Sequence, residues 1–279
     1  MTLNDAFVAL VDIASRYESD SSARTIAKYI LEDVFPEYTK LNKGDFDIED
    51  SIKFRHILDR LRYQEPYQYI TNRADFYGKS FFVDNRVLIP RPETEELAHK
   101  AISLIRKHHL TSCLDIGTGS GVLPITIALE TGIKNVSGLD ISEGALEVAK
   151  MNASKHLVEI NWHHIDVLDF EQLSNVPNAQ LIISNPPYIT KDEQAGMAAN
   201  VLDHEPHNAL FVKHNALEFY SAISTWVTRL KQKTYVVFEI SEFRAKEVVQ
   251  LLSNLHFHEI ELLEDMQRKQ RIVTACFIE

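Results

Sequence analysis

The chain is poor in cysteine. It has two among 279 residues, Cys113 and Cys276, and both stand in apolar runs, which predicts reduced core residues rather than a disulfide framework. No apolar run approaches the roughly 20 residues that span a bilayer. The first residues carry Asp5 and Asp12 and lack the basic segment that opens a signal peptide. We therefore expect a cytoplasmic protein with no membrane partner, and not a secreted one.

Positive charge is also scarce. Lys and Arg number 29 against 40 Asp and Glu, which gives a formal net charge of −11. Binding to nucleic acid that does not depend on sequence comes mainly from Lys and Arg on phosphates. We therefore expect no stable nucleic-acid binding. The overall charge is still compatible with a local basic groove.

The N-terminal part, residues 1–70, has helical periodicity but no chemical signature. Apolar side chains recur at helical spacing in stretches that begin near Leu3, Ile26 and Ile52. The pattern predicts a small helical domain that serves packing or the recognition of a partner.

Residues 66–92 change to β-forming types, of which Tyr67 and Ile70 are among the first. Turn residues interrupt them, so the pattern predicts a β-hairpin connector over residues 71–92. The connector ends at Ile89-Pro90-Arg91-Pro92, where two prolines hold the chain extended.

In the remainder, residues 93–279, strand and helix patterns alternate. Strands are expected at residues 113–116, 136–139, 160–165, 181–183, 235–240, 259–263 and 272–278, and helices near 93–104, 121–130, 142–156, 215–231 and 242–254. The last two strands have no helix between them and predict an antiparallel hairpin at the sheet edge. The fold class is therefore α/β, with a doubly wound, mostly parallel seven-stranded sheet and an antiparallel C-terminal edge.

A glycine-rich segment, Gly117-Thr118-Gly119-Ser120-Gly121, follows the first of these strands and opens a helix. In such sheets ligands bind beyond the carboxyl ends of the strands, and glycines let the backbone approach them. Asp140 ends the next strand, nineteen residues after Gly121, where an acid can accept bonds from two ribose hydroxyls. Val122 replaces the third glycine of a dinucleotide fingerprint, and no Gly-Lys-Ser/Thr marks a triphosphate loop. A nucleoside site of another type is predicted.

A second segment, Asn185-Pro186-Pro187-Tyr188, leaves another strand at the same edge of the sheet. The prolines remove backbone donors and stiffen the turn, which leaves carbonyl groups free to face a ligand. The Asn185 side chain adds an acceptor and a donor, and Tyr188 adds a flat face. The segment predicts a binding site that adjoins the glycine turn.

The spacing of Asp115, the glycine segment and Asp140 resembles that of class I S-adenosylmethionine-dependent methyltransferases. The resemblance implies S-adenosyl-L-methionine as cofactor and S-adenosyl-L-homocysteine as product. It implies that residues 117–121 pack on the methionine portion and that Asp140 holds the ribose. Asp166 would contact the adenine amino group, and Val167 would lie against the adenine face.

The Asn-Pro-Pro-Tyr segment resembles the motif of enzymes that methylate a planar –NH₂ group. In that resemblance the Asn185 side-chain oxygen and the Pro186 carbonyl accept two N–H bonds from the substrate, and Asn185 also borders the cofactor. Tyr188 would pack on the planar group, and Pro187 would complete the substrate site. Because the sulfonium methyl is already activated, catalysis would be mostly orientation and electrostatics.

Nearly the whole chain is similar to the protein-(glutamine-N5) methyltransferases of peptide chain release factors. The connector carries the resemblance, with Gln64-Glu65-Pro66-Tyr67-Gln68-Tyr69-Ile70 and Leu88-Ile89-Pro90-Arg91-Pro92-Glu93-Thr94-Glu95, and Glu205-Pro206 follows later. The resemblance implies that residues 1–70 recognise the substrate. It also implies methylation of the side-chain amide nitrogen of the glutamine in the Gly-Gly-Gln motif of a class I release factor.

Several positions depart from this family's usual sequence. Gln64 and Asn72 stand where the family usually has glycine, and neither the turn at Lys231 nor residues 265–271 contain one. His204 replaces an aromatic residue. These departures bear on connector geometry and on the fit to the partner, not on the reaction.

Alternatives stay open at this stage. An adenine-N6 methyltransferase acting on DNA or ribosomal RNA can use the same motif, but it should carry a basic face or an inserted recognition region. A methyltransferase-like binding module without catalysis is a third interpretation. The acids and histidines at residues 203–207 predict a solvated loop and no metal site. Arg91 would form either a surface salt bridge or a contact with the cofactor carboxylate or the release factor.

Overall fold

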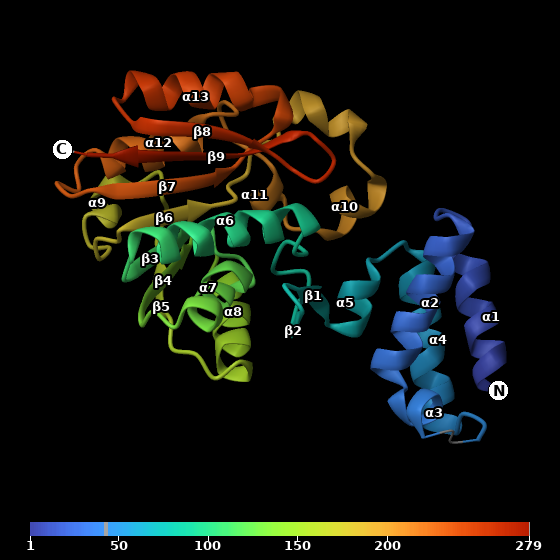
Figure 1. Cartoon of the computed structure of the whole chain (residues 1–279). Coiled ribbons are helices and arrows are strands. Elements are labelled where there is room, and N and C mark those ends of the chain that lie inside the picture. The colour runs from blue at the N-terminus through green and yellow to red at the C-terminus, as the bar shows by residue number, and fades with distance from the viewer. Residues whose placement is uncertain (42–43, 279) are drawn as a thin grey trace. The chain divides into compact units, whose positions relative to one another are not determined.

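The computed structural model of the chain describes residues 1–41 and 44–278 (Figure 1). They form two compact units. The N-terminal unit comprises the described residues of Met1–Arg73 with Val83–Asn85 and Ala198–His204. The sheet unit comprises Ala74–Phe82, Arg86–Met197 and residues 205–278.

The N-terminal unit is helical. Its helices are α1 (Leu3–Ala14), α2 (Asp20–Val34), α3 (Pro36–Lys40), α4 (Ile48–Arg62), α5 (Tyr67–Thr71) and α10 (Ala199–His204). Thr2 and Asp5 form a reciprocal capping box at the start of α1, which satisfies two backbone N–H groups. The apolar stripes of α1, α2 and α4 meet in one core, where Leu10, Ile30 and Phe54 are buried. The predicted N-terminal helices are confirmed.

Helix α5 departs from the expectation by residue type, because Tyr67 and Ile70 are β-forming residues but lie in a helix. Pro66 stands at its N-cap, a position that needs no backbone N–H. The Arg60 guanidinium donates to the carbonyl of Tyr69 at 3.0 Å, and so satisfies a group at the helix end. This tertiary contact outweighs the weak β propensity of the aromatic residues.

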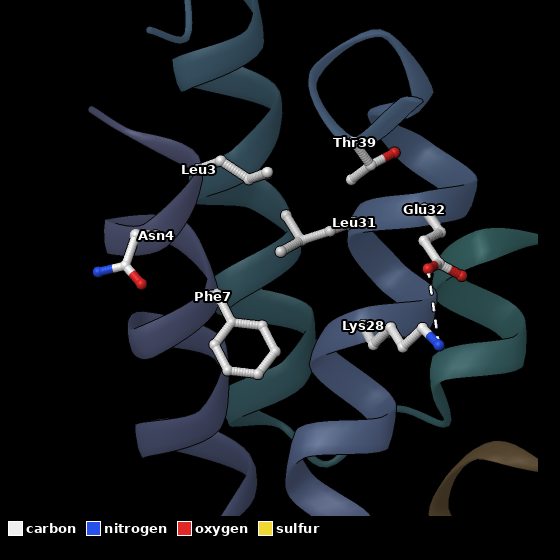
Figure 2. A pocket seen from close by; sticks show the side chains of 7 residues that line it. All are labelled: Leu3, Asn4, Phe7, Lys28, Leu31, Glu32 and Thr39. Atoms are coloured by element: carbon white, nitrogen blue, oxygen red, sulfur yellow. Dashed lines mark ion pairs between the residues drawn. The ribbon is translucent and has the colours of Figure 1, made fainter. Parts of the chain in front are cut away.

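The surface of the N-terminal unit has a groove of about 300 Å³. Phe7 of α1 and Leu31 of α2 project into it, and Thr39 of α3 borders it (Figure 2). Lys28 and Glu32, which form an ion pair at 3.8 Å, lie along its rim. The groove therefore offers a small apolar floor edged by charge.

The sheet unit contains a seven-stranded sheet in the order β5-β4-β3-β6-β7-β9-β8. The strands are β3 (Ser112–Ile116), β4 (Asn135–Asp140), β5 (Asn161–His164), β6 (Leu181–Ser184), β7 (Thr234–Glu239), β8 (His258–Glu264) and β9 (Gln270–Phe277). The strands β3 to β7 pair in parallel, while β9 pairs antiparallel with β7 and β8. The predicted mostly parallel sheet with an antiparallel C-terminal edge is confirmed.

Helices cover both faces of this sheet (Figure 1). They are α6 (Pro92–His108), α7 (Val122–Thr131), α8 (Glu143–Lys155), α9 (Phe170–Leu173), α11 (His207–Leu210), α12 (Glu218–Val227) and α13 (Ala245–Asn254), with the 3₁₀ turns Lys191–Gly196 and Glu242–Arg244. Successive strand residues pack on opposite faces, so Ile183 joins the core of α6 and α7, while Ile182 joins that of α12 and α13. The central strands β3, β6 and β7 are therefore buried along their whole length, as a sheet covered on both faces requires.

Only a short hairpin forms in the connector. Strands β1 (Ala74–Phe76) and β2 (Lys79–Phe81) pair antiparallel around Tyr77-Gly78, both of which have positive φ. The Asn152 side chain of α8 binds the backbone N–H and carbonyl of Phe82. The hairpin is thereby attached to the sheet unit, and the chain continues without regular structure to α6.

Two further sequence predictions concern burial. Cys113 and Cys276 are free and buried, as expected of core residues. Within the two described ranges, no helix is both long and apolar enough to cross a membrane.

Candidate active site

The register of three parallel strands brings the predicted site residues to one edge of the sheet. Ile116 of β3 is paired with Leu139 of β4 on one side and with Ser184 of β6 on the other. The Ser184 hydroxyl also donates to the Ile116 carbonyl at 2.6 Å. The chain positions that follow these residues are Gly117, Asp140 and Asn185. Strand pairing alone therefore places the glycine turn between the acid and the asparagine.

A cavity of about 260 Å³ opens at this edge. The predicted residues that line it are Gly117, Gly119, Asp140, Asp166, Val167, Asn185, Pro186 and Pro187. The other lining residues come from residues 86–88, from the ends of β3 to β5, and from residues 208–219. The cavity is thus lined by residues of both the glycine segment and the Asn-Pro-Pro-Tyr segment.

The turn between β3 and α7 is held by backbone bonds to β4. The N–H groups of Gly117 and Thr118 both donate to the Leu139 carbonyl at 2.9 Å, and the Gly119 N–H donates to Asp140 Oδ2 at 2.9 Å. Gly117 and Gly119 have φ of 76° and 53°, a region that side chains disfavour. The glycines therefore allow the backbone to follow the cavity wall.

Each carboxylate oxygen of Asp140 accepts one hydrogen bond from the protein backbone. Oδ2 accepts from Gly119 and Oδ1 accepts from the Ser142 N–H, both at 2.9 Å. A carboxylate offers about four acceptor positions, so two remain for a ligand. Burial raises the pKa of Asp140 above its ordinary value, although these backbone donors oppose the shift.

Asp166 and Val167 follow β5 and lie in the cavity wall. The Asp166 carboxylate accepts from the Leu168 N–H at 2.9 Å, which closes a local turn. Val167 is 7% exposed and belongs to the core that packs against α12 and α13. The pair offers a polar and an apolar surface side by side.

Asn185 is tied to a buried network. Its Nδ2 donates to Thr94 Oγ1 at 3.1 Å, and that hydroxyl donates to Glu239 Oε2 at 2.8 Å. Thr94 lies in the first turn of α6, and Glu239 is the last residue of β7. Burial raises the pKa of Glu239 to about 7, and the Thr94 hydroxyl partly opposes this.

Four predicted residues do not line this cavity: Thr118, Ser120, Gly121 and Tyr188. Thr118 and Ser120 are buried, and the Ser120 carbonyl accepts from Asn152 Nδ2 at 2.9 Å. Tyr188 packs against the core of α12 and α13, where burial raises its pKa to about 12. Their predicted roles stay predictions.

Gly121 stands where α7 meets α8. A Cβ there would lie 3.0 Å from the Cβ of Ala149 and 3.1 Å from the Trp162 ring. Gly121 therefore permits close packing of the two helices, the role that a glycine at the end of such a turn often has.

Asp115 lies in β3 directly beneath the glycine turn and is 1% exposed. Neither of its carboxylate oxygens has a hydrogen-bond partner among the described residues. Burial raises its pKa to about 7; the nearby Thr118 hydroxyl lowers it, and Asp140 adds to the rise. A carboxyl group without a partner is thus buried one turn from the cavity.

The segment at residues 203–207 corrects a prediction, because it is not a solvated loop. Glu205 is 4% exposed, and Arg91 Nη2 donates to its Oε1 at 2.6 Å. The Ile89 N–H donates to its Oε2 at 3.4 Å. The structure thus shows Arg91 in a salt bridge, but with a buried partner. No group of three metal-binding side chains occurs in the part of the chain that the structure describes.

Sequence reasoning missed Thr94 and Glu239 as parts of this site. Glu239 carried a signal, since it is an acid in an otherwise apolar strand and stands at the carboxyl end where ligands bind. Thr94 carried none beyond its place in the connector motif, because its contact is with a residue 145 positions away.

The sequence of this chain is similar to those of known methyltransferases. A family model described as Methyltransferase small domain matches residues 99–213. The release factor glutamine methyltransferase of Flavobacterium psychrophilum is 36% identical over 231 residues, which cover 81% of this chain and 80% of that protein. That of Bacillus cereus is 38% identical over 216 residues, which cover 75% and 76%.

Solved structures are also similar to the chain. The hMettl16 catalytic domain in complex with MAT2A 3′UTR hairpin 6 has a TM-score of 0.58 and 15% identity, covering 90% of this chain and 91% of that one. This likeness shows the fold alone. The two bacterial relatives carry the family assignment, and they confirm the resemblance found in the sequence: this chain belongs to the release factor glutamine methyltransferases.

Proposed function

We propose that the enzyme transfers a methyl group from S-adenosyl-L-methionine to the glutamine amide nitrogen of the Gly-Gly-Gln motif in a class I release factor. The single observation that carries this proposal is the meeting of Asn185 and Pro186 with the glycine turn and Asp140 in one cavity. We further propose that the reaction takes place in the cytoplasm.

The residues present fit this cofactor. The two unused acceptor positions of Asp140 match the two hydroxyls of a ribose. Gly117 and Gly119 would lie against the methionine portion, where an added Cβ would meet no protein atom within 4 Å and would occupy ligand space instead. Asp166 would accept from the adenine amino group, and Val167 would lie against the ring.

The chain's own residues would orient the acceptor nitrogen. When bound, S-adenosyl-L-methionine supplies a sulfonium methyl that is already activated for transfer. The Asn185 side-chain oxygen and the Pro186 carbonyl would accept the two N–H bonds of the glutamine carboxamide. An amide nitrogen is a poor nucleophile because its lone pair is delocalised, so holding both N–H groups directs that lone pair toward the methyl. Orientation is the main contribution expected from these residues.

The direct test is to incubate the protein with labelled cofactor and either a release factor or DNA and ribosomal RNA. We expect label on the release factor, and mass spectrometry should place it on the Gly-Gly-Gln glutamine. Label on nucleic acid alone would favour the adenine-N6 alternative. Lack of cofactor binding in calorimetry would instead favour a binding module without catalysis.

The division of labour within the cavity has its own test. Asn185→Ala should abolish transfer but leave cofactor binding largely intact, because the cofactor contacts proposed here lie mainly on the glycine turn and on β4 and β5. Activity would be followed by label transfer and binding by calorimetry. Loss of both together would show that Asn185 supports the fold of the cavity instead.

We also propose that residues 1–70 recognise the release factor. The groove over Phe7 and Leu31 supports this, since it offers an apolar floor with a charged rim. Phe7→Ala should raise KM for the release factor several-fold, because less apolar area would be buried. Cofactor affinity should not change. An unchanged KM would exclude this groove from the contact.

A further inference from the structure

We infer that Thr94 and Glu239 act as positioning residues that determine which end of the Asn185 carboxamide faces the cavity. The inference rests on the proposed role of Asn185 as the acceptor for the substrate amide. It concerns how that acceptor is oriented before a substrate arrives.

The three side chains come from three separate elements. Asn185 follows β6, Thr94 lies in the first turn of α6, and Glu239 ends β7. Thr94 is 5% exposed and Glu239 is 3% exposed, so their bonds form away from solvent. The network therefore links the cavity wall to the interior of the sheet unit.

The chemistry of the three groups fixes the direction of each bond. An ionised carboxylate only accepts, so the single hydroxyl proton of Thr94 goes to Glu239. The Thr94 oxygen must then accept, and only the –NH₂ end of Asn185 can donate to it. The Asn185 oxygen is consequently the end left for a substrate N–H. With the opposite orientation, the –NH₂ of Asn185 would face the –NH₂ of the substrate, and no hydrogen bond could form.

Glu239 is itself held in place. Tyr220 Oη donates to its backbone carbonyl at 2.9 Å, and Ile272 of β9 is its partner in the sheet. The titratable and charged groups that face its carboxylate are Glu93 of α6, Arg91 just before that helix, Arg271 of β9, and Tyr188 and Tyr220 on the α12 side. The nearest of these cations are engaged elsewhere, Arg91 by Glu205 and Arg271 by Asp265.

This arrangement ties the direction of the network to the protonation of Glu239. A protonated Glu239 can donate to Thr94, which frees the Thr94 proton to be donated to the Asn185 oxygen and reverses the carboxamide. Because burial raises the pKa of Glu239 to about 7, both forms are populated near neutral pH. The active direction belongs to the ionised form, so activity should rise as pH increases through this range.

The first test removes the hydroxyl without changing the shape of the side chain. Thr94→Val should lower kcat about tenfold or more, since the acceptor is no longer oriented. Cofactor affinity should stay within about twofold, and Thr94→Ser should restore kcat because it keeps the hydroxyl. The matched control is Thr126→Val in α7, which removes a buried hydroxyl that has no hydrogen-bond partner among the described residues and should leave kcat unchanged.

The second test is the pH profile of kcat. The wild type should show an acidic limb near pH 7, and Glu239→Gln should remove that limb, because the variant side chain does not ionise. The profile of the variant should be nearly flat between about pH 6 and 8. Thermal melts of every variant would separate misfolding from loss of orientation.

The outcomes separate this inference from the proposed function. A wild type that does not methylate a release factor refutes the proposed function. An active wild type together with a fully active, folded Thr94→Val variant refutes only the positioning role. A parallel loss of kcat and cofactor affinity, or a Glu239→Gln variant that keeps the acidic limb, would also overturn it.

Discussion

Left-handed backbone positions have different occupants in two regions of the molecule. In the turn between β3 and α7 they are the glycines Gly117, Gly119 and Gly121. In turns outside the cavity, apart from Gly78 and Gly132, they are larger residues, among them Gln64, Lys231 and Arg268, with φ between 49° and 63°. A side chain in this conformation costs about 1–2 kcal/mol. The chain avoids this cost where the backbone lines the cavity and accepts it at most of the turns that only connect elements.

The two regions also differ in where an energetically unfavourable feature lies relative to the cavity. Beneath the glycine turn, Asp115 is buried with no hydrogen-bond partner in the part of the chain that the structure describes, next to the strand that ends in Asp140. In the outer turns, Gln64, Lys231 and Arg268 do not line the cavity. We therefore expect substitutions near the glycine turn to affect ligand binding or the pH dependence of stability, and substitutions in the outer turns to affect only the size of the stability.

The largest effect should come from Asp115. Its folded pKa of about 7 lies above its ordinary value of 3.8, so the folded state binds the proton more tightly. Its contribution to stability is present at acidic pH and is lost as pH rises from about 4 through 7, up to about 4 kcal/mol. Urea unfolding should therefore show that the free energy of unfolding of Asp115→Asn increases relative to that of the wild type as pH rises from 5 to 8. A difference independent of pH would mean that Asp115 is ionised in the fold.

The second prediction uses the two ends of α7. Gly121→Ala should cost about 2–4 kcal/mol, because it adds a close contact with Ala149 to the backbone cost. Gly132→Ala at the other end, where an added Cβ meets nothing within 4 Å, should cost only about 1 kcal/mol. Urea unfolding measures both. Equal losses would show that backbone strain alone sets the requirement for glycine at residue 121.

The third prediction concerns Asp140. Asp140→Ala should weaken cofactor binding by about 1.5–3 kcal/mol, the range for hydrogen bonds to a charged group. The change also releases the N–H groups of Gly119 and Ser142, so the turn itself should loosen. Calorimetry measures the affinity, and an unchanged value would refute the ribose contact. The variant Asp140→Asn keeps one acceptor oxygen and should lose less.

The sequence predicted most of the sheet unit because its signals are local. Apolar strands and periodic helices repeat along the chain, and the glycine turn and Asn185 stand at strand ends. The contacts that orient these groups depend on distant pairs, such as Thr94 with Glu239 and Arg91 with Glu205, whose partners only the fold brings together. The helical state of the β-forming residues in α5 has the same kind of cause, because Arg60 stabilises the end of this helix from another helix.

The outer turns should give the smallest effect, and it should be favourable. Gln64 and Lys231 are exposed and left-handed, so replacement by glycine removes backbone strain without removing a buried contact. Glycine also increases the conformational entropy of the unfolded chain, which offsets part of this stabilisation. About 0.5–1 kcal/mol of stabilisation should remain for each variant. Asn72→Gly is the matched control: asparagine tolerates this conformation, and Asn72 Nδ2 donates to the Val83 carbonyl at 3.1 Å. Urea unfolding should show gains for Gln64→Gly and Lys231→Gly, no gain for Asn72→Gly, and the same kcat in the first two. A loss of kcat in Lys231→Gly would mean that this turn, like the one after β3, is coupled to the cavity.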